Sequence, residues 1–238
     1  MSDSCIAGQL SDYERGVLRA ALVNAAKKPE VVIEVGTWLG GGSTLNILQA
    51  LQHNGIGHLW GIEADRSVYQ QMLSNIGTAG PEISARFTPL FGRSGDVIPR
   101  WLAETNAEPV DFVFLDGGNN PGEQIQEFKL LDPCIPAGGQ LMSHDAKMRT
   151  GKWLVPYLSC LDNWRVQLHE PSEFGLMHAL KLAPKPSPAS RRAAEILLLK
   201  MRAHPVEIAA ACLPARVCGF ILGLLPTRFA RRLSDGRV

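Results

Sequence analysis

Apolar residues along the chain fall into two kinds of stretch, short continuous runs and longer segments with helical spacing. The continuous runs predict buried strands at residues 31–35, 58–62, 110–115 and 139–143. A less regular segment at 84–90 predicts one further strand. Apolar side chains three or four positions apart predict helices within residues 9–27, 45–51, 67–76 and 97–103. Because strands and helices alternate in this order, we expect a doubly wound α/β fold with a mostly parallel sheet.

Two local patterns refine the ends of this series. At the start, Ser11 with Glu14 three residues later predicts a helix cap. Near the other end, the runs 164–169 and 175–182 are separated by a polar turn and predict a hairpin. The hairpin would close the sheet.

The first strand leads into a glycine-rich turn that extends to Thr44. Its glycines allow a ligand to approach the backbone closely, and Ser43 or Thr44 is placed to cap the next helix. A strand, a glycine turn and a helix amino-terminus are typical of nucleotide sites. Glu34, beside the first glycine, would repel a pyrophosphate but could pair with the cationic methionine end of S-adenosylmethionine.

Glu63 lies 29 residues beyond Glu34, at the end of the second predicted strand. That spacing equals one strand, one helix and one strand, so both carboxylates should lie at the carboxyl edge of neighbouring strands. A carboxylate at this position can accept hydrogen bonds from both hydroxyls of an adenosine ribose. Dinucleotide enzymes share this feature, so Glu63 predicts a nucleoside rather than a particular reaction.

Two later strands also end in groups that bind metals. Asp116 follows the run 110–115, and His144 and Asp145 follow the run 139–143. Side chains at the ends of adjacent parallel strands should converge. Two carboxylates with one imidazole suit a divalent cation, and the histidine shifts the preference from magnesium towards manganese, iron or zinc.

These segments together resemble the metal-dependent O-methyltransferases, the group that includes catechol and macrocin O-methyltransferases. The resemblance covers about residues 10–182 and depends on four segments: Glu34 to Thr44, Ile62 to Asp65, Phe114 to Gly118, and the strand that ends at His144-Asp145. It implies a seven-stranded Rossmann-like methyltransferase fold. It also implies transfer of a methyl group from S-adenosylmethionine to a hydroxyl oxygen, assisted by a divalent metal such as magnesium or manganese.

The resemblance assigns expected roles to individual residues. Glu34 and the glycine turn would hold the methionine end, Glu63 the ribose, and Ser94 with Gly95 the adenine. The full expected cofactor set is Glu34, Gly36, Thr37, Gly40, Ser43, Glu63, Ser94, Gly95 and Asp116. The expected metal ligands are Asp116, His144 and Asp145.

The chain departs from this family in two places. Relatives usually end the last parallel strand in Asp-Asp, Asp-Asn or Glu-Asp, whereas this chain has His144-Asp145. Relatives often carry a Lys or His base where this chain has Asn119, and an amide does not accept a proton near neutral pH. The remaining candidates for the base are His144, Lys147 and Lys152, unless a metal acidifies the acceptor enough for a weak base to suffice.

Charge is distributed unevenly in a chain of 238 residues with a formal net charge of +1. Residues 1–187 hold 15 Lys/Arg against 20 Asp/Glu, a net charge of −5, and residues 188–238 hold 9 against 3, a net charge of +6. An acidic main body argues against nucleic acid as a partner. Five scattered cysteines and the absence of a signal-peptide pattern predict a cytoplasmic protein.

The last part of the chain differs in composition from the rest. A proline-rich linker at 184–188 separates the expected methyltransferase domain, residues 1–183, from a basic apolar tail, residues 184–238. We expect Ser190 to cap a helix there, followed by an apolar stretch at 208–225 that is too broken to span a bilayer. We expect residues 190–238 to form either a peripheral membrane contact or a homodimer interface.

Two other functions stay open at this point. The first is an NAD(P)-dependent oxidoreductase or epimerase, although no tyrosine is followed by lysine in the Tyr-x-x-x-Lys spacing of the short-chain enzymes. The second is a non-catalytic S-adenosylmethionine-binding protein, which Asn119 and the unusual tail would fit. The expected acceptor for the main hypothesis is a small molecule, a sugar or natural-product hydroxyl.

Overall fold

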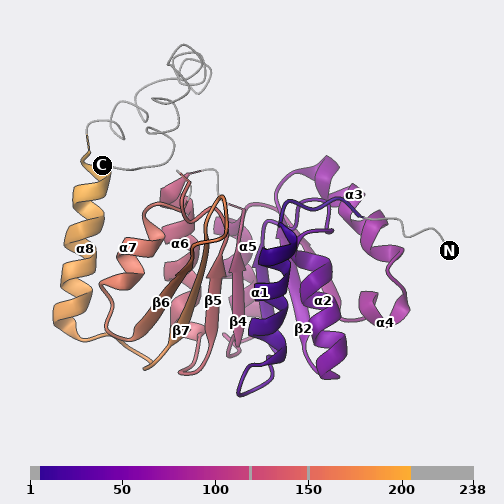
Figure 1. Ribbon diagram of the computed structural model, residues 1–238, viewed down its shortest axis with the longest axis horizontal. Coiled ribbons are helices and arrows are strands. Elements are labelled where there is room, and N and C mark those ends of the chain that lie inside the picture. The colour runs from indigo at the N-terminus through magenta and orange to yellow at the C-terminus, as the bar shows by residue number, and fades with distance from the viewer. Residues whose placement is uncertain (1–5, 118–119, 149–150, 205–238) are drawn as a thin grey trace, which may run out of the picture.

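A seven-stranded sheet runs through the middle of the computed structural model, which describes residues 6–117, 120–148 and 151–204 (Figure 1). In spatial order the strands are β3 (Phe87–Phe91), β2 (His58–Glu63), β1 (Val31–Val35), β4 (Phe112–Leu115), β5 (Gln140–Ser143), β7 (Leu176–Lys181) and β6 (Trp164–His169). Strands β1 to β5 pair in parallel, whereas β7 is antiparallel to both of its neighbours. The predicted mostly parallel sheet with a closing hairpin is confirmed.

Helices cover both faces of this sheet. They are α1 (Asp12–Val23), α2 (Ser43–Asn54), α3 (Arg66–Gly77), α4 (Pro81–Ser84), α5 (Ser94–Glu104), α6 (Pro121–Leu131), α7 (Leu154–Ser159) and α8 (Pro188–Arg202), with a short 3-10 turn η1 (Asp132–Cys134). Helices α1, α2 and α3 contribute to one hydrophobic cluster, and α5, α6, α7 and α8 contribute to a second. Figure 1 shows the sheet between the helices, with α8 at the opposite end from α3 and α4.

The continuous apolar run of β1 has a direct structural explanation. Ile33 and Val35 belong to the α5–α8 cluster and Val32 to the α1–α3 cluster, because successive side chains of a strand point to opposite faces. Glu34 therefore points to the face covered by α1 and α2. A fully buried carboxylate results from this position in the central strand.

Two predicted helix caps are wrong, and one is confirmed. Ser11 and Glu14 form the complete capping box of α1. Helix α2 begins at Ser43 after Gly42, without a side-chain cap, so neither Ser43 nor Thr44 has the predicted capping role. Helix α8 is capped by Ser187, three residues before the predicted Ser190, because Pro188 fits the first helical position.

The carboxyl ends of three central strands lie side by side and place the candidate site. Asp116 N donates to Val35 O at 2.8 Å, and His144 N donates to Leu115 O at 3.1 Å, so the segments after β1, β4 and β5 follow one edge. The β6–β7 turn reaches the same edge, where Ala146 N donates to Gly175 O at 2.9 Å. Residues separated by more than a hundred positions therefore meet at this edge.

The described part of the tail packs onto the main body. Ala194 and Leu198 of α8 are buried in the cluster formed with α6 and α7. Glu195 accepts hydrogen bonds from Lys129 Nζ and Tyr157 Oη, both at 2.7 Å. The division at residue 183 stays a prediction, and the stretch 208–225 lies outside the described residues. No helix among the described residues is long and apolar enough to cross a membrane.

Candidate functional site

The glycine turn after β1 lies directly against the turn after β4. Gly36 has φ +88°, and a Cβ atom added there would be 2.5 Å from Gly117 Cα and 2.6 Å from Asp116 O. A larger residue at position 36 would separate the two turns. Gly40 packs against Met72 and Ile76 of α3. The predicted cofactor turn and Asp116 are therefore parts of one continuous site.

Gly41 serves a contact that the sequence did not predict. A Cβ atom at this position would collide with the backbone carbonyls of Ile6 and Ala7. The segment before α1 thus crosses the glycine turn at close range. Trp38, within the same turn, has φ +45°, a left-handed conformation that non-glycine residues adopt at an energetic cost and that clusters at functional sites.

Glu34 is the most deeply buried acid of the turn. Its side chain has no exposed surface, and neither carboxylate oxygen has a hydrogen bond of ordinary geometry among the described residues. Burial raises the pKa of Glu34 to about 8; the nearby hydroxyls of Ser43 and Thr44 lower it, and the charges of Asp116 and Glu63 raise it further. Thr37 Oγ1, in the same turn, also has no partner among the described residues. Buried polar atoms without partners are typical of a site that a ligand completes.

Glu63 lies at the end of β2, as predicted. Its two carboxylate oxygens accept from Trp38 N and Asp65 N, each at 3.0 Å. Each carboxylate oxygen can accept a second hydrogen bond, so the group remains able to bind hydroxyls. The predicted ribose contact is compatible with this geometry and stays a prediction.

Ser94 and Gly95 form the first turn of α5, and they adjoin an acid that the sequence analysis missed. Ser94 Oγ donates to Glu127 Oε1 at 2.6 Å. Glu127 is buried on α6, and burial raises its pKa to about 7 although the hydrogen bond from Ser94 lowers it. No helix was predicted at residues 121–131, and the signal in the sequence was only an acid between the apolar residues Ile125 and Phe128.

Asp116, His144 and Asp145 converge, as the sequence predicted. One ligand atom from each lies within 4.8 Å of the others. His144 Nδ1 is 3.3 Å from Asp116 Oδ1 and 3.3 Å from Asp145 Oδ1. Asp145 has φ +58°, a second costly left-handed backbone within the site.

The charges of this cluster depend on one another. Burial lowers the pKa of His144, but Asp116, Asp145 and Glu14 outweigh burial and raise it to about 9. Burial raises the pKa of Asp116, against the hydrogen bond and charge of His144. Three carboxylates thus surround one imidazole, and the excess negative charge fits a divalent cation. Two carboxylates and an imidazole nitrogen also match the donor set of manganese, iron or zinc.

Glu14 is the second site residue that the sequence analysis missed. Its predicted role was only that of a cap partner, yet its side chain is buried and Oε1 lies 3.3 Å from His144 Nε2. The same oxygen accepts a hydrogen bond from Ser172 Oγ of the β6–β7 turn. The capping motif explains the residue type, and nothing in the local sequence indicates its second contact.

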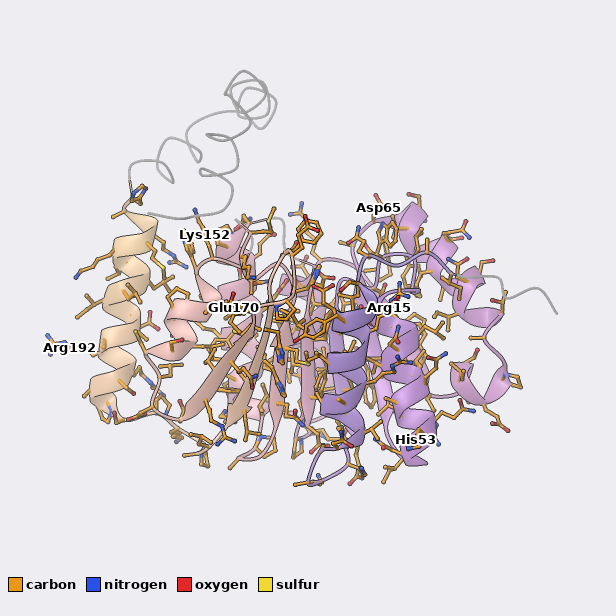
Figure 2. All side chains as sticks on the ribbon, viewed as in Figure 1. Arg15, His53, Asp65, Lys152, Glu170 and Arg192 are labelled. Carbon is orange, nitrogen blue, oxygen red and sulfur yellow. The ribbon has the colours of Figure 1, made fainter. Side chains whose placement is uncertain are left out.

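Of the predicted bases, His144 belongs to the cluster, whereas Lys147 is bound to the β6–β7 turn. Lys147 Nζ donates to the backbone carbonyls of Glu170 and Ser172, both at 2.9 Å, and thereby binds the β6–β7 turn. Asn119 lies outside the described residues. Figure 2 shows Lys152 and Asp65 on the side of the molecule where the parallel strands end. Phe174, a half-exposed aromatic residue, lies edge-on to the His144 ring with 6.2 Å between ring centroids.

Comparison with known proteins agrees with this arrangement. A family model described as a methyltransferase domain matches residues 33–146, which include every strand end from β1 to β5. No curated protein gives a significant match.

Solved structures share the fold at low sequence identity. An O-methyltransferase from Bacillus cereus in complex with SAH has a TM-score of 0.56 and 19% identity, and the match covers 73% of this chain and 82% of that chain. An SAH-bound methyltransferase from Podospora anserina has a TM-score of 0.59 and 12% identity, with 73% and 80% covered. A precorrin-6y C5,15-methyltransferase from Geobacter metallireducens has a TM-score of 0.55 and 14% identity, with 76% and 93% covered.

These matches bear on the fold and the reaction class. The seven strands, the mostly parallel sheet and the closing hairpin are those predicted for a Rossmann-like methyltransferase fold. The family match extends over Glu34, Glu63, Asp116 and the end of β5. The fold and the match to a methyltransferase domain over residues 33–146 agree with the expected class I S-adenosylmethionine-dependent methyltransferase.

Proposed function

We propose that this enzyme transfers the methyl group of S-adenosylmethionine to a hydroxyl oxygen of a small molecule, a sugar or natural-product hydroxyl, with the help of a divalent cation. One observation carries the proposal: the cluster of Asp116, His144 and Asp145 adjoins the turn expected to hold the methyl donor. Methyl donor and acceptor oxygen would meet at the contact between the two turns. The expected relation to O-methyltransferases agrees with the shared fold.

On the cofactor side, Glu34 would pair with the positive methionine end. Its buried carboxyl lacks a partner among the described residues, so a cation there would replace the solvation lost on folding. Glu63 would hold the ribose, and Ser94 with Gly95 the adenine. Thr37, Gly40 and Ser43 complete the turn. Holding both reactants in line supplies much of the rate.

On the acceptor side, Asp116, His144 and Asp145 would hold the divalent cation, magnesium or manganese. Bound there, the cation would act as a Lewis acid that lowers the pKa of the acceptor hydroxyl. Nδ1 of His144 faces both carboxylates and would be taken up by the cation, so the role of His144 in the proposal is that of a ligand rather than of the base.

The proposed methyl transfer does not require a strong base. The bond from sulfur to the methyl carbon breaks, a bond from oxygen to that carbon forms, and neutral S-adenosylhomocysteine leaves. The acceptor hydroxyl loses its proton. Asp145, the most exposed of the three cluster side chains, is placed to pass this proton to water.

The proposal is tested by measuring methyl transfer to polyhydroxylated metabolites by mass spectrometry, with and without divalent metal. We expect at least one hydroxyl acceptor to gain a methyl group only when metal is present. Methylation of nitrogen or carbon acceptors alone would contradict the proposal. Calorimetry with S-adenosylmethionine and NAD addresses the oxidoreductase alternative, which the family match does not favour.

The role of residues 190–238 is a separate proposal, either peripheral membrane contact or a homodimer. Because α8 packs onto α7, a chain that ends at His204 is a better comparison than one that ends before α8. Stronger liposome pelleting of the full chain would support membrane contact. Equal pelleting with concentration-dependent dimerisation would support the second possibility.

A further inference from the structure

Glu14 connects three distant segments at the candidate site. It lies in the first turn of α1, and its side chain is 2% exposed. The residues around it come from α1, from the β6–β7 turn and from the end of β5. A buried carboxylate costs free energy unless it is paired and hydrogen-bonded, so its contacts require an explanation.

The helix cap accounts for only one of its two oxygens. Oε2 accepts from Ser11 N at 2.8 Å and from Ser11 Oγ at 2.9 Å, which completes the capping box. Oε1 takes no part in the cap. It accepts from Ser172 Oγ and lies 3.3 Å from His144 Nε2.

We propose that Glu14 is a positioning residue, which holds the His144 ring by Nε2 so that Nδ1 faces Asp116 and Asp145. This inference rests on the proposed cation site. A histidine that binds a metal through one ring nitrogen usually engages a carboxylate or carbonyl with the other, which fixes the orientation of the ring. In His144, Nε2 lies 3.3 Å from Glu14 Oε1, an ion-pair contact without hydrogen-bond geometry, and Nδ1 lies 3.3 Å from a carboxylate oxygen of both Asp116 and Asp145.

The surroundings hold the Glu14 carboxylate in place. Oε2 is bound by Ser11 of the helix cap, and Oε1 is bound by Ser172 of the β6–β7 turn. Ser172 is itself buried, so the β6–β7 turn holds Oε1 against His144. The hairpin that closes the sheet would thus help to set the metal ligand.

The test measures Mn²⁺ affinity by electron paramagnetic resonance on the full chain and on two variants. Glu14→Gln keeps the cap, because glutamine also serves at this capping position, and it removes the charge that faces His144. We expect it to weaken Mn²⁺ binding about 10- to 100-fold, the usual loss when an outer partner of a metal ligand is removed. Ser11→Ala is the matched control, which should lower the melting temperature while Mn²⁺ affinity is retained.

The outcomes separate this inference from the proposed function. If Glu14→Gln binds Mn²⁺ as wild type does, while Asp116→Ala does not bind it, Glu14 has no positioning role and the cation site stands. If the wild-type chain binds S-adenosylhomocysteine but no Mn²⁺, the cation site itself is wrong. Ser172→Ala provides a second variant if Glu14→Gln does not fold, and unchanged Mn²⁺ affinity in Ser172→Ala would then overturn the inference.

Discussion

The cofactor side of the site, Glu34 to Thr44 with Glu63, differs from the cation side, Asp116 with His144 and Asp145, in the origin of its supporting contacts. On the cofactor side the groups lie within one strand–turn–helix unit and the next strand. On the cation side, His144 contacts Glu14 of α1, and Glu14 contacts Ser172, 158 residues away along the chain. The residues of the cofactor side are therefore close together in sequence, although Gly36 and Gly41 pack on distant segments, whereas the contacts of His144 and Glu14 on the cation side depend on the closed fold.

The substitution with the largest expected effect, Asp116→Ala, should impair methyl transfer without impairing cofactor binding. Asp116→Ala removes a proposed metal ligand, so we expect methyl transfer to fall by more than about 100-fold, beyond the usual cost of losing an outer partner. The affinity for S-adenosylmethionine, measured by calorimetry, should change little. Glu104→Ala, an exposed acid on α5, is the control. Equal loss of cofactor binding and transfer in Asp116→Ala would mean that the two sides are not separable.

Glu34→Gln, in contrast, should impair cofactor binding directly. Removing one partner of a buried ion pair typically costs about 3–5 kcal/mol, so we expect S-adenosylmethionine affinity to fall by about 100-fold or more. Because Glu34 has a pKa of about 8, cofactor binding near pH 7 should release a proton from wild type and none from the variant. Calorimetry in buffers of different ionisation enthalpy measures this proton. Proton release by both proteins would argue against Glu34 as the partner.

Without cofactor, the folding stability of the enzyme should depend on the protonation of Glu34. The pKa of Glu34 is raised from 4.5 to about 8 on folding, so its protonated form stabilises the folded state. That contribution is complete below about pH 4.5 and is lost as pH rises through about 8. We expect Glu34→Gln to flatten this part of the stability profile, measured by denaturant unfolding between pH 5 and 9. Parallel profiles for both proteins would count against the buried, unpaired state.

The smallest expected effect concerns two partly exposed aromatic residues, one at the cation side and one away from it. Phe174 lies against His144, and Phe91 lies at the end of β3, with a ring centroid 5.3 Å from that of Tyr69. Loss of an aromatic contact costs about 0.5–1.5 kcal/mol, or roughly two- to tenfold in a binding constant. We expect Phe174→Ala to raise KM for the acceptor, and Phe91→Ala to leave it unchanged. Steady-state kinetics with saturating cofactor would show either result.

Local pattern was enough to predict the sheet and the groups at its carboxyl edge. Strands β1 and β6 have the predicted bounds, and Asp116, His144 and Asp145 converge as their places after adjacent strands require. The pattern did not distinguish Ser43 as a cap from Ser43 as a neighbour of Glu34, because a serine at a helix start fits both roles.

Side-chain contacts between distant segments could not be predicted. Glu14 was predicted only as part of a helix cap, and no helix was predicted around Glu127. Only the packing of α1 on the hairpin and of α5 on α6 shows that both are buried against polar partners. Gly41 is a similar case, since its close neighbour is the segment before α1. Such contacts depend on which helices and strands pack together, and the periodicity of apolar residues does not predict that packing.

The central claim is that a divalent cation between Asp116, His144 and Asp145 assists methyl transfer beside the cofactor turn. The most direct measurement is the initial rate of methyl transfer by metal-depleted enzyme at saturating S-adenosylmethionine, before and after Mn²⁺ is added back. We expect the rate to fall to background in chelator and to recover with Mn²⁺. An unchanged rate in chelator would contradict the account.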